Sequence, residues 1–193
     1  GQAIGPLPAG VAEGSCQVLH RENRLPVPGG VGAVNTVPVN GYDKVTTFIS
    51  LLRGSKLGVA CLLDTFTDQK GKQKVQDLVA QKIIKEKHIR FFDEFVGGET
   101  KVADVEDLFE KAEYLKYFNL AFSSEHPELK VSDLDAKLQT TIKQINKAIG
   151  KDRFNHYRPA SQLIQVAPKA GDLSKETLDR FERVFIEINK LFE

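Results

Sequence analysis

One apolar run that ends in a carboxylate constrains the fold of this chain more than any other stretch. Residues 57–63 read LGVACLL, and Asp64 follows them directly. An apolar run of this length between Gly58 and a polar cluster is typical of a strand buried on both faces of a parallel sheet. Because ligands of open α/β sheets bind beyond the carboxyl ends of the strands, Asp64 is a candidate for chemistry. Capping of the next helix is the alternative role for this residue.

Helical patterns on both sides of this run predict an α/β fold. Apolar residues recur with helical spacing over residues 42–52 and again over 73–87, and further strands are expected at 36–39 and 88–92. Strands that alternate with helices favour parallel pairing through right-handed crossovers. We therefore expect residues 37–92 to form strand, helix, strand, helix and strand in that order.

The C-terminal half is expected to be helical. Its apolar spacing predicts helices over 104–115 and 132–149, and a short helix that begins near Pro159. The last helix is expected to begin after Asp172 or Ser174, which are good capping residues.

The first 36 residues differ from the rest of the chain. They are rich in glycine and proline and show no sustained helical or strand period. We expect residues 1–36 to form an irregular leader, although 10–12 and 17–19 could still join an edge strand or a short helix. Residues 37–193 are expected to form the folded domain.

The composition narrows the class of protein. The net charge is +1, which provides no overall field for coating nucleic acid or a membrane surface. No run approaches the roughly 18 apolar residues of a membrane span, and the N-terminus lacks the pattern of a signal peptide. Two cysteines make no disulfide framework. We expect a cytoplasmic protein with no membrane association, and a fragment, because the chain contains no methionine.

Two groups of carboxylates are candidates for metal ligands. Asp64 follows the buried strand, and Asp104, Glu106 and Asp107 begin the helix predicted after the loop at 93–101. Oxygen ligands of this kind suit Mg²⁺, and two such ions can hold the attacking and leaving oxygens of a phosphodiester. The alternative is that the acidic residues only stabilise the first turn of a helix. The residues alone leave both interpretations open.

The segment KDRFNHYR at 151–158 combines basic and aromatic residues. Lys151 or Arg153 could stabilise the charge of a phosphate, and His156 and Arg158 could contact a nucleic-acid backbone. A structured loop that packs its aromatic residues under the last helix is the alternative. Lysines around the helix predicted at 73–87 could also follow a phosphate backbone, or they could simply face solvent.

Four motifs in this order resemble a known family. VPVNGYDKVTTFISLL, VACLLDTFTD, KVADVEDLF and FNHYRPA are similar to the C-terminal Toprim region of class 2 overcoming-lysogenization-defect (OLD) nucleases, over Val37 to Glu193. The resemblance implies a Toprim fold, a Rossmann-like parallel sheet flanked by helices, with additional C-terminal helices. It also implies a metal-dependent DNA endonuclease that uses two Mg²⁺ or Mn²⁺ ions. Its ATPase domain would lie elsewhere in the full-length protein, because no Walker motif or other nucleotide site is found here.

The resemblance implies roles for individual residues. Asp64, Asp104 and Glu106 match the metal ligands of the family, and Lys151 matches its late catalytic lysine. Glu13 and Gly14 match the first Toprim motif, which would make Glu13 a metal ligand and general acid or base. Two positions depart from the family pattern. Gln17 occupies the place of an expected aspartate, and Phe66 occupies that of a second acid after the strand.

The predicted function is nicking or cleavage of DNA by a two-metal mechanism. A Toprim-like module that binds DNA or a partner protein without catalysis is the alternative, which Gln17 favours. A third hypothesis is a regulatory domain that binds a small ligand near Asn40 and Asp64. The sequence leaves the oligomeric state open, including a homo-oligomer.

Overall fold

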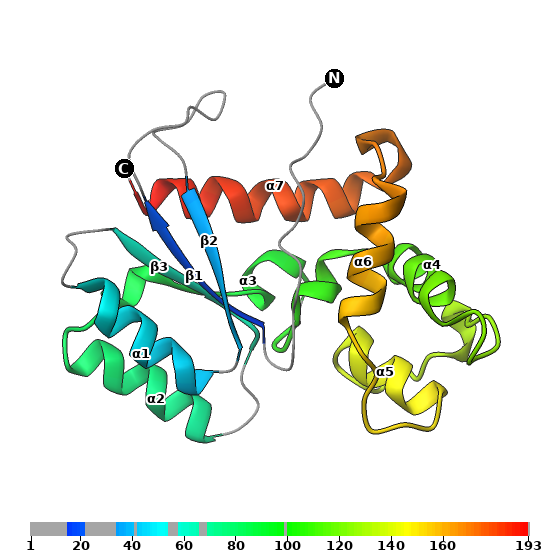
Figure 1. Cartoon of the computed structure of the whole chain (residues 1–193), viewed down its shortest axis with the longest axis horizontal. Coiled ribbons are helices and arrows are strands. Elements are labelled where there is room, and N and C mark those ends of the chain that lie inside the picture. Colours follow the sequence, from blue (N-terminus) through cyan, green and yellow to red (C-terminus); the bar gives the residue numbers. More distant parts are fainter. Residues whose placement is uncertain are drawn as a thin grey trace.

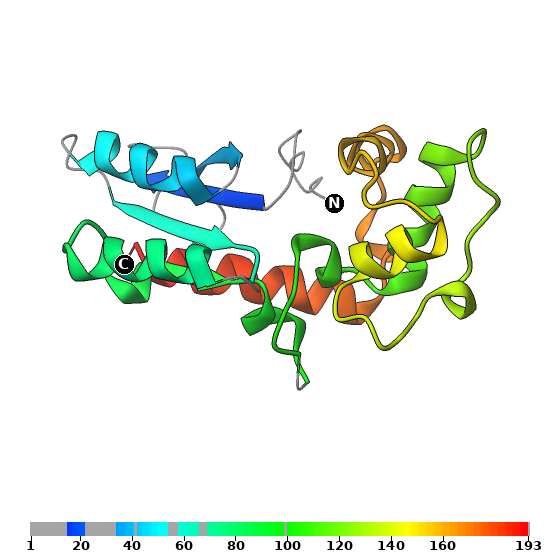
Figure 2. The same ribbon diagram turned by 90° about the horizontal axis from the view of Figure 1, so that it is seen from below.

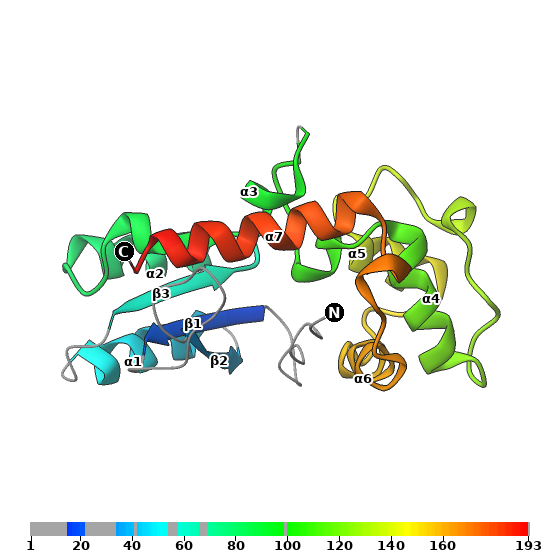
Figure 3. The ribbon, with the colours of Figure 1, turned by 90° about the horizontal axis from the view of Figure 1, so that it is seen from above.

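The computed structural model describes residues 15–21, 34–40, 42–53, 58–65, 69–98 and 100–192. It shows an α/β structure in which a four-stranded sheet lies beside a helical part. Figure 1 shows the sheet with helices α1 (Tyr42–Arg53) and α2 (Gln69–Ala80) at one end of the molecule and the helical part at the other. The long helix α7 (Lys175–Lys190) extends along both, and the two perpendicular views agree (Figures 2 and 3).

The sheet has the strand order β2-β1-β3-β4. Its strands are β1 (Ser15–Arg21), β2 (Val34–Asn40), β3 (Val59–Leu63) and β4 (Ile89–Phe91). The β3 and β4 strands pair in parallel, whereas β1 is antiparallel to both β2 and β3. The strands predicted at 36–39, 57–63 and 88–92 are therefore present in the sheet.

The expectation of parallel pairing throughout is wrong, and so is that of an irregular leader over 15–21. β1 arises within the first 36 residues, and it is an inner strand rather than an edge strand. The alternation of strands and helices requires β2 and β3 to run in the same direction, and they do. It does not require them to be neighbours, so β1 can lie between them and pair with both. Pro38 is tolerated because β2 lies at the edge of the sheet.

β3 is buried on both faces, as its continuous apolar run predicts. Cys61 and Leu63 belong to a core with Val45 and Ile49 of α1 and Leu78 of α2. The alternate residues of β3 face a second core, formed with α7 and the short helix α3 (Asp93–Val96). That core contains Ala60, Leu62, Phe92, Phe95, Val184 and Ile188.

The helices that pack on the sheet agree in part with their predicted bounds. α1 confirms the helix predicted over 42–52. α2 is shorter than the helix predicted over 73–87. It ends at Ala80, before Lys82 with its positive φ of 55°, and a 3₁₀ turn η1 (Glu86–His88) leads into β4. The final helix α7 begins after Ser174, whose hydroxyl accepts a hydrogen bond from the backbone N–H of Thr177, as the capping pattern predicts.

The helical part is built around a third core. Its elements are η2 (Val105–Leu108), α4 (Lys111–Phe122), η3 (Val131–Asp133), α5 (Thr141–Ala148), α6 (Tyr157–Val166) and η4 (Ala170–Asp172). Phe118, Phe122, Ile145 and Phe154 lie at its centre. None of the described helices has the length and apolar character needed to cross a membrane.

Two predicted helices of this part have the wrong bounds. The helix expected over 104–115 is divided, because Phe109 and Glu110 are extended and Glu110 caps the start of α4. The helix expected over 132–149 begins only at Thr141, where Thr140 serves as the N-cap. Both helices begin where a polar side chain forms a hydrogen bond with the backbone. The spacing of apolar residues does not show where such a bond forms.

Candidate functional site

A pair of hydrogen bonds joins the end of β3 to the segment before η2. The N–H of Thr65 donates to the carbonyl oxygen of Ala103 at 3.0 Å, and the N–H of Ala103 donates to Oγ1 of Thr65 at 3.2 Å. The Thr65 hydroxyl donates in turn to Oδ1 of Asp93 at 2.6 Å. Because Asp64 and Asp104 each adjoin a member of this pair, the two acidic motifs meet at the carboxyl end of β3.

These carboxylates influence one another electrostatically. Glu106 is only 8% exposed, and burial raises the pKa of its carboxyl group well above the usual range. The negative charges of Asp64, Asp104 and Asp107 raise this pKa further. Carboxylates that repel one another in a buried place retain protons or attract a cation.

The pKa of Asp104 is raised by the same two causes, and the positive charge of a lysine opposes the rise. The pKa of Asp104 rises from 3.8 to about 6, chiefly through burial and then through the charge of Asp107. A hydrogen bond with Thr140 and the charge of Lys143 lower the pKa of Asp104, but they do not offset the other effects. Lys143, an exposed residue of α5, is therefore the lysine whose charge reaches this carboxylate.

Asp107 has a structural role in the same cluster. Its Oδ1 accepts hydrogen bonds from the N–H of Thr141 at 2.8 Å and from the Thr141 hydroxyl at 2.6 Å. Its Oδ2 accepts a hydrogen bond from the N–H of Asp104 at 2.9 Å. For this residue the helix-start interpretation is confirmed, because its carboxylate binds the first residue of α5 and closes the turn of η2.

Two further side chains from the helical part adjoin Glu106. Nδ1 of His156, at the start of α6, lies 3.6 Å from Oε1 of Glu106. The hydroxyl of Tyr114, on α4, is buried and has no hydrogen-bond partner among the described residues. Burial raises the pKa of Tyr114 well above its usual range, and the charges of Glu106, Asp107 and Asp104 add to this shift.

The predicted basic residues lie in a different environment. Lys151 follows α5, is exposed, and acts electrostatically on Glu125. Arg158 donates to the Glu125 carboxylate and to the carbonyl of Ala121, and its guanidinium lies 4.0 Å from the ring centroid of Phe122. Arg158 thus ties α6 to α4. The structured-loop interpretation places the aromatic residues of this segment under the last helix, but Phe154 packs against Phe118 and Phe122 of α4.

Four further residues that the sequence analysis singled out lie away from this cluster or outside the described residues. Arg153 is exposed at the same turn. Glu13 and Phe66 lie outside the described residues, so the first Toprim motif and the position after Asp64 stay predictions. Gln17 lies within β1, where its backbone is in register with Pro38 and Leu62.

Sequence reasoning missed two contributors to this cluster, Tyr114 and Lys143. Tyr114 was hidden within an apolar helical stripe, where a hydroxyl that needs a partner was the available signal. Lys143 had no signal, because its approach to Asp104 depends on where α5 begins.

The chemistry of the donors fits a hard divalent cation. The charges of Asp64 and Asp104 act on Glu106, the pKa values of Asp104 and Glu106 are raised, and the buried Tyr114 hydroxyl has no hydrogen-bond partner within the part of the chain that the structure describes. Within the described ranges, no three acidic, histidine or cysteine side chains are grouped closely enough to hold one ion. Binding through one or two carboxylates, with water completing the shell, is the usual mode of Mg²⁺.

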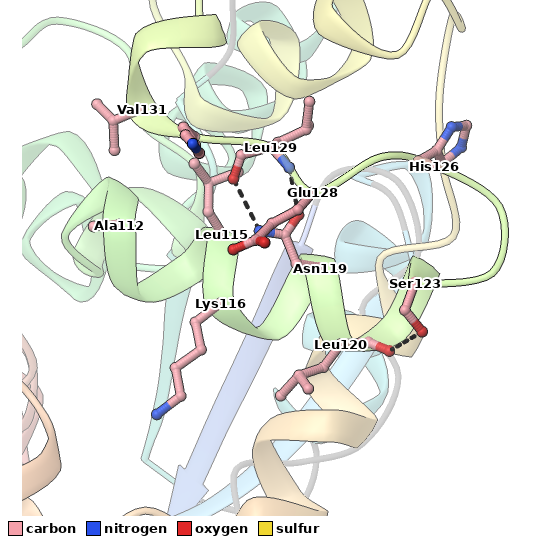
Figure 4. Close-up of a pocket in the computed structure, with 11 residues that line it drawn as sticks. Ala112, Leu115, Lys116, Asn119, Leu120, Ser123, His126, Glu128, Leu129 and Val131 are labelled. Atoms are coloured by element: carbon pink, nitrogen blue, oxygen red, sulfur yellow. Dashed lines mark hydrogen bonds between the residues drawn. The ribbon is translucent and has the colours of Figure 1, made fainter.

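A groove of about 600 Å³ lies elsewhere, on α4. Leu115, Lys116 and Val131 are among its lining residues, and the Asn119 side chain both donates to and accepts from the backbone of Leu129 (Figure 4). The predicted site residues do not line this groove, so it is separate from the acidic cluster.

Comparisons with known proteins add no assignment to this geometry: no family model, curated protein or solved structure matches the chain.

Proposed function

We propose that this protein cleaves the phosphodiester bonds of DNA with Mg²⁺ or Mn²⁺, and that Asp64, Asp104 and Glu106 hold the cations. The observation that supports this most is the reciprocal hydrogen bonding of Thr65 and Ala103, which brings a strand-end acid and a separate acidic motif to one place. Carboxylates gathered at the carboxyl end of β3 also agree with the general location of ligand sites in open α/β sheets.

The chain's own residues would prepare the site for the reaction. Bound cations would supply charge stabilisation and an activated water for hydrolysis. The raised pKa values of Asp104 and Glu106 mean that these groups give up protons when a cation binds. Lys143, whose charge reaches Asp104, is placed to attract a phosphate group. Lys151 and Glu13 keep the roles that the resemblance implies, as phosphate stabiliser and as acid or base.

The proposal extends to the family that the sequence resembles. An α/β fold with a parallel β3–β4 pair and an acid after β3 is compatible with a Toprim domain of an OLD nuclease. The antiparallel β1 departs from the sheet that such a domain implies. We propose DNA as the substrate and an ATPase domain of the same full-length protein as the partner.

Plasmid nicking tests this function. Wild-type protein is incubated with supercoiled plasmid in Mg²⁺, Mn²⁺ or EDTA, beside Asp64→Ala. We expect metal-dependent nicking by the wild type only, with equal far-UV circular dichroism for both proteins. Nicking retained by Asp64→Ala would show that the carboxylate cluster is not the active site.

A second candidate is favoured because the charge of Lys151 acts on Glu125, whereas the charge that acts on Asp104 is that of Lys143. In this alternative, the protein is a Toprim-like module that binds DNA or a partner without cleaving it, through surfaces such as the exposed Lys70, Lys72 and Lys74 of α2. It predicts DNA binding in EDTA, no Mn²⁺ affinity and no cleavage. Mn²⁺ titration alongside the nicking assay separates the two candidates.

A further inference from the structure

His156 contacts Glu106 where the sheet meets the helical part. Nδ1 of His156 and Oε1 of Glu106 are 3.6 Å apart, and the side chains are only 17% and 10% exposed. This separation exceeds a hydrogen bond, but both side chains are shielded from water, and a small rotation of either one lets the imidazole N–H donate to the carboxylate. Through the pair, the start of α6 reaches the acidic segment η2.

The imidazole is supported on its other side by the core of the helical part. The ring of Phe154 lies 4.7 Å from that of His156, between centroids. Phe154 packs edge-on against Phe118 at 5.0 Å and Phe122 at 5.7 Å. His156 therefore has a fixed platform, and this limits the positions that its Nδ1 atom can take.

We propose that His156 is a positioning residue, which holds the Glu106 carboxylate in the orientation that binds a divalent cation. This inference rests on the metal-dependent function proposed above. In this inference the partner of His156 is the Glu106 carboxylate, whereas the sequence analysis suggested that His156 contacts a phosphate of DNA. Groups that orient a metal-binding carboxylate contribute about 10–100-fold to metal affinity.

Two substitutions separate this role from simple packing. His156→Asn keeps an N–H donor near the position of Nδ1 but loses most of the ring that packs on Phe154. His156→Leu has a similar size and retains an apolar contact with Phe154, but it has no donor. A positioning role predicts that Asn is the milder change, whereas a packing role predicts that Leu is milder.

The measurement is Mn²⁺ affinity, determined by isothermal titration of the full chain without DNA. We expect His156→Leu to weaken binding about 10-fold or more, and His156→Asn to remain within about threefold of the wild type. His126→Leu is the matched control, because His126 packs on Phe118 and Phe122 of the same core but lies in the turn after α4, next to Glu125. This control should bind Mn²⁺ like the wild type.

Each remaining outcome overturns a distinct claim. Wild-type Mn²⁺ affinity in His156→Leu, with weaker DNA binding, would assign this histidine to a phosphate contact and refute the positioning role. A larger loss in Asn than in Leu would show a packing role instead. If the wild type itself binds no Mn²⁺, the proposed metal-dependent function fails, and the inference fails with it.

Discussion

Thr65 and Ala103 bond to each other twice, through Thr65 N–H to Ala103 O at 3.0 Å and Ala103 N–H to Thr65 Oγ1 at 3.2 Å. The first bond extends backbone pairing beyond the end of β3, and the second depends on the threonine side chain. A single side chain thus determines how closely the strand that ends at Asp64 approaches the segment that begins with Asp104.

Thr65→Val tests this connection. Valine preserves the shape of threonine but leaves Ala103 N–H and the Asp93 carboxylate without the hydroxyl. We expect a loss of about 1–3 kcal/mol in the free energy of unfolding, and at least tenfold slower plasmid nicking because the acids separate. Thr47→Val is the control, since Thr47 is exposed on α1. Equal nicking by Thr65→Val and the wild type would contradict the connection.

Asp104→Asn is expected to stabilise the protein in EDTA at pH 7. The pKa of Asp104 is raised to about 6, so its stabilising contribution is fully present below pH 3.8 and is lost as pH rises through 6. Ionisation of this carboxyl group at pH 7 costs about 2–3 kcal/mol. Asparagine removes that cost, so urea unfolding should show a gain of this order at pH 7 and no gain below pH 4. A gain that does not change with pH would point to another cause.

Asp107→Ala should have the opposite effect. The change removes a carboxylate that accepts bonds from Thr141 N–H, the Thr141 hydroxyl and Asp104 N–H. We expect destabilisation by about 2–4 kcal/mol, because buried donors lose a charged acceptor. Asp133→Ala provides the comparison, since the bonds that Asp133 accepts from Lys130 N–H at 2.8 Å and from the Ser132 hydroxyl at 3.5 Å are both exposed. Similar unfolding midpoints for these two variants would refute the structural role of Asp107.

Much of the fold was predictable because it depends on local signals. The buried run that forms β3, the spacing of α1 and the Ser174 cap of α7 each specify an element without knowledge of its neighbours. β1 was not predictable in the same way, because it pairs with β2 on one side and β3 on the other. The start of α5 depends on Asp107, which lies far earlier in the sequence.

The candidate site, like the fold, was only partly predictable from the sequence. The approach of the Asp64 and Asp104 segments follows the rule that strand ends gather functional groups, and the charges of both residues act on Glu106. Their role as metal ligands stays a prediction. The neighbours of Glu106 from the helical part, His156 and Tyr114, depend on how α4 and α6 pack, which periodicity does not report.

Two lysines compete for the role of phosphate stabiliser. The resemblance assigns it to Lys151, whereas the structure places the charge of Lys143 near Asp104. We expect Lys143→Ala to slow single-turnover nicking about tenfold, with recovery in Lys143→Arg, and Lys151→Ala to remain within about twofold of the wild type. If Lys151→Ala slows nicking about tenfold and Lys143→Ala does not, Lys151 is the phosphate stabiliser.

Anomalous diffraction from Mn²⁺-soaked crystals tests whether these acids bind a metal ion. We expect a peak at the carboxyl end of β3, with carboxylate oxygens of Asp64 and of Asp104 or Glu106 at about 2.0–2.3 Å from the ion. In Asp64→Asn crystals the peak should weaken or vanish. No peak at this position in the wild type, despite saturating Mn²⁺, would contradict the claim that these acids form a metal site.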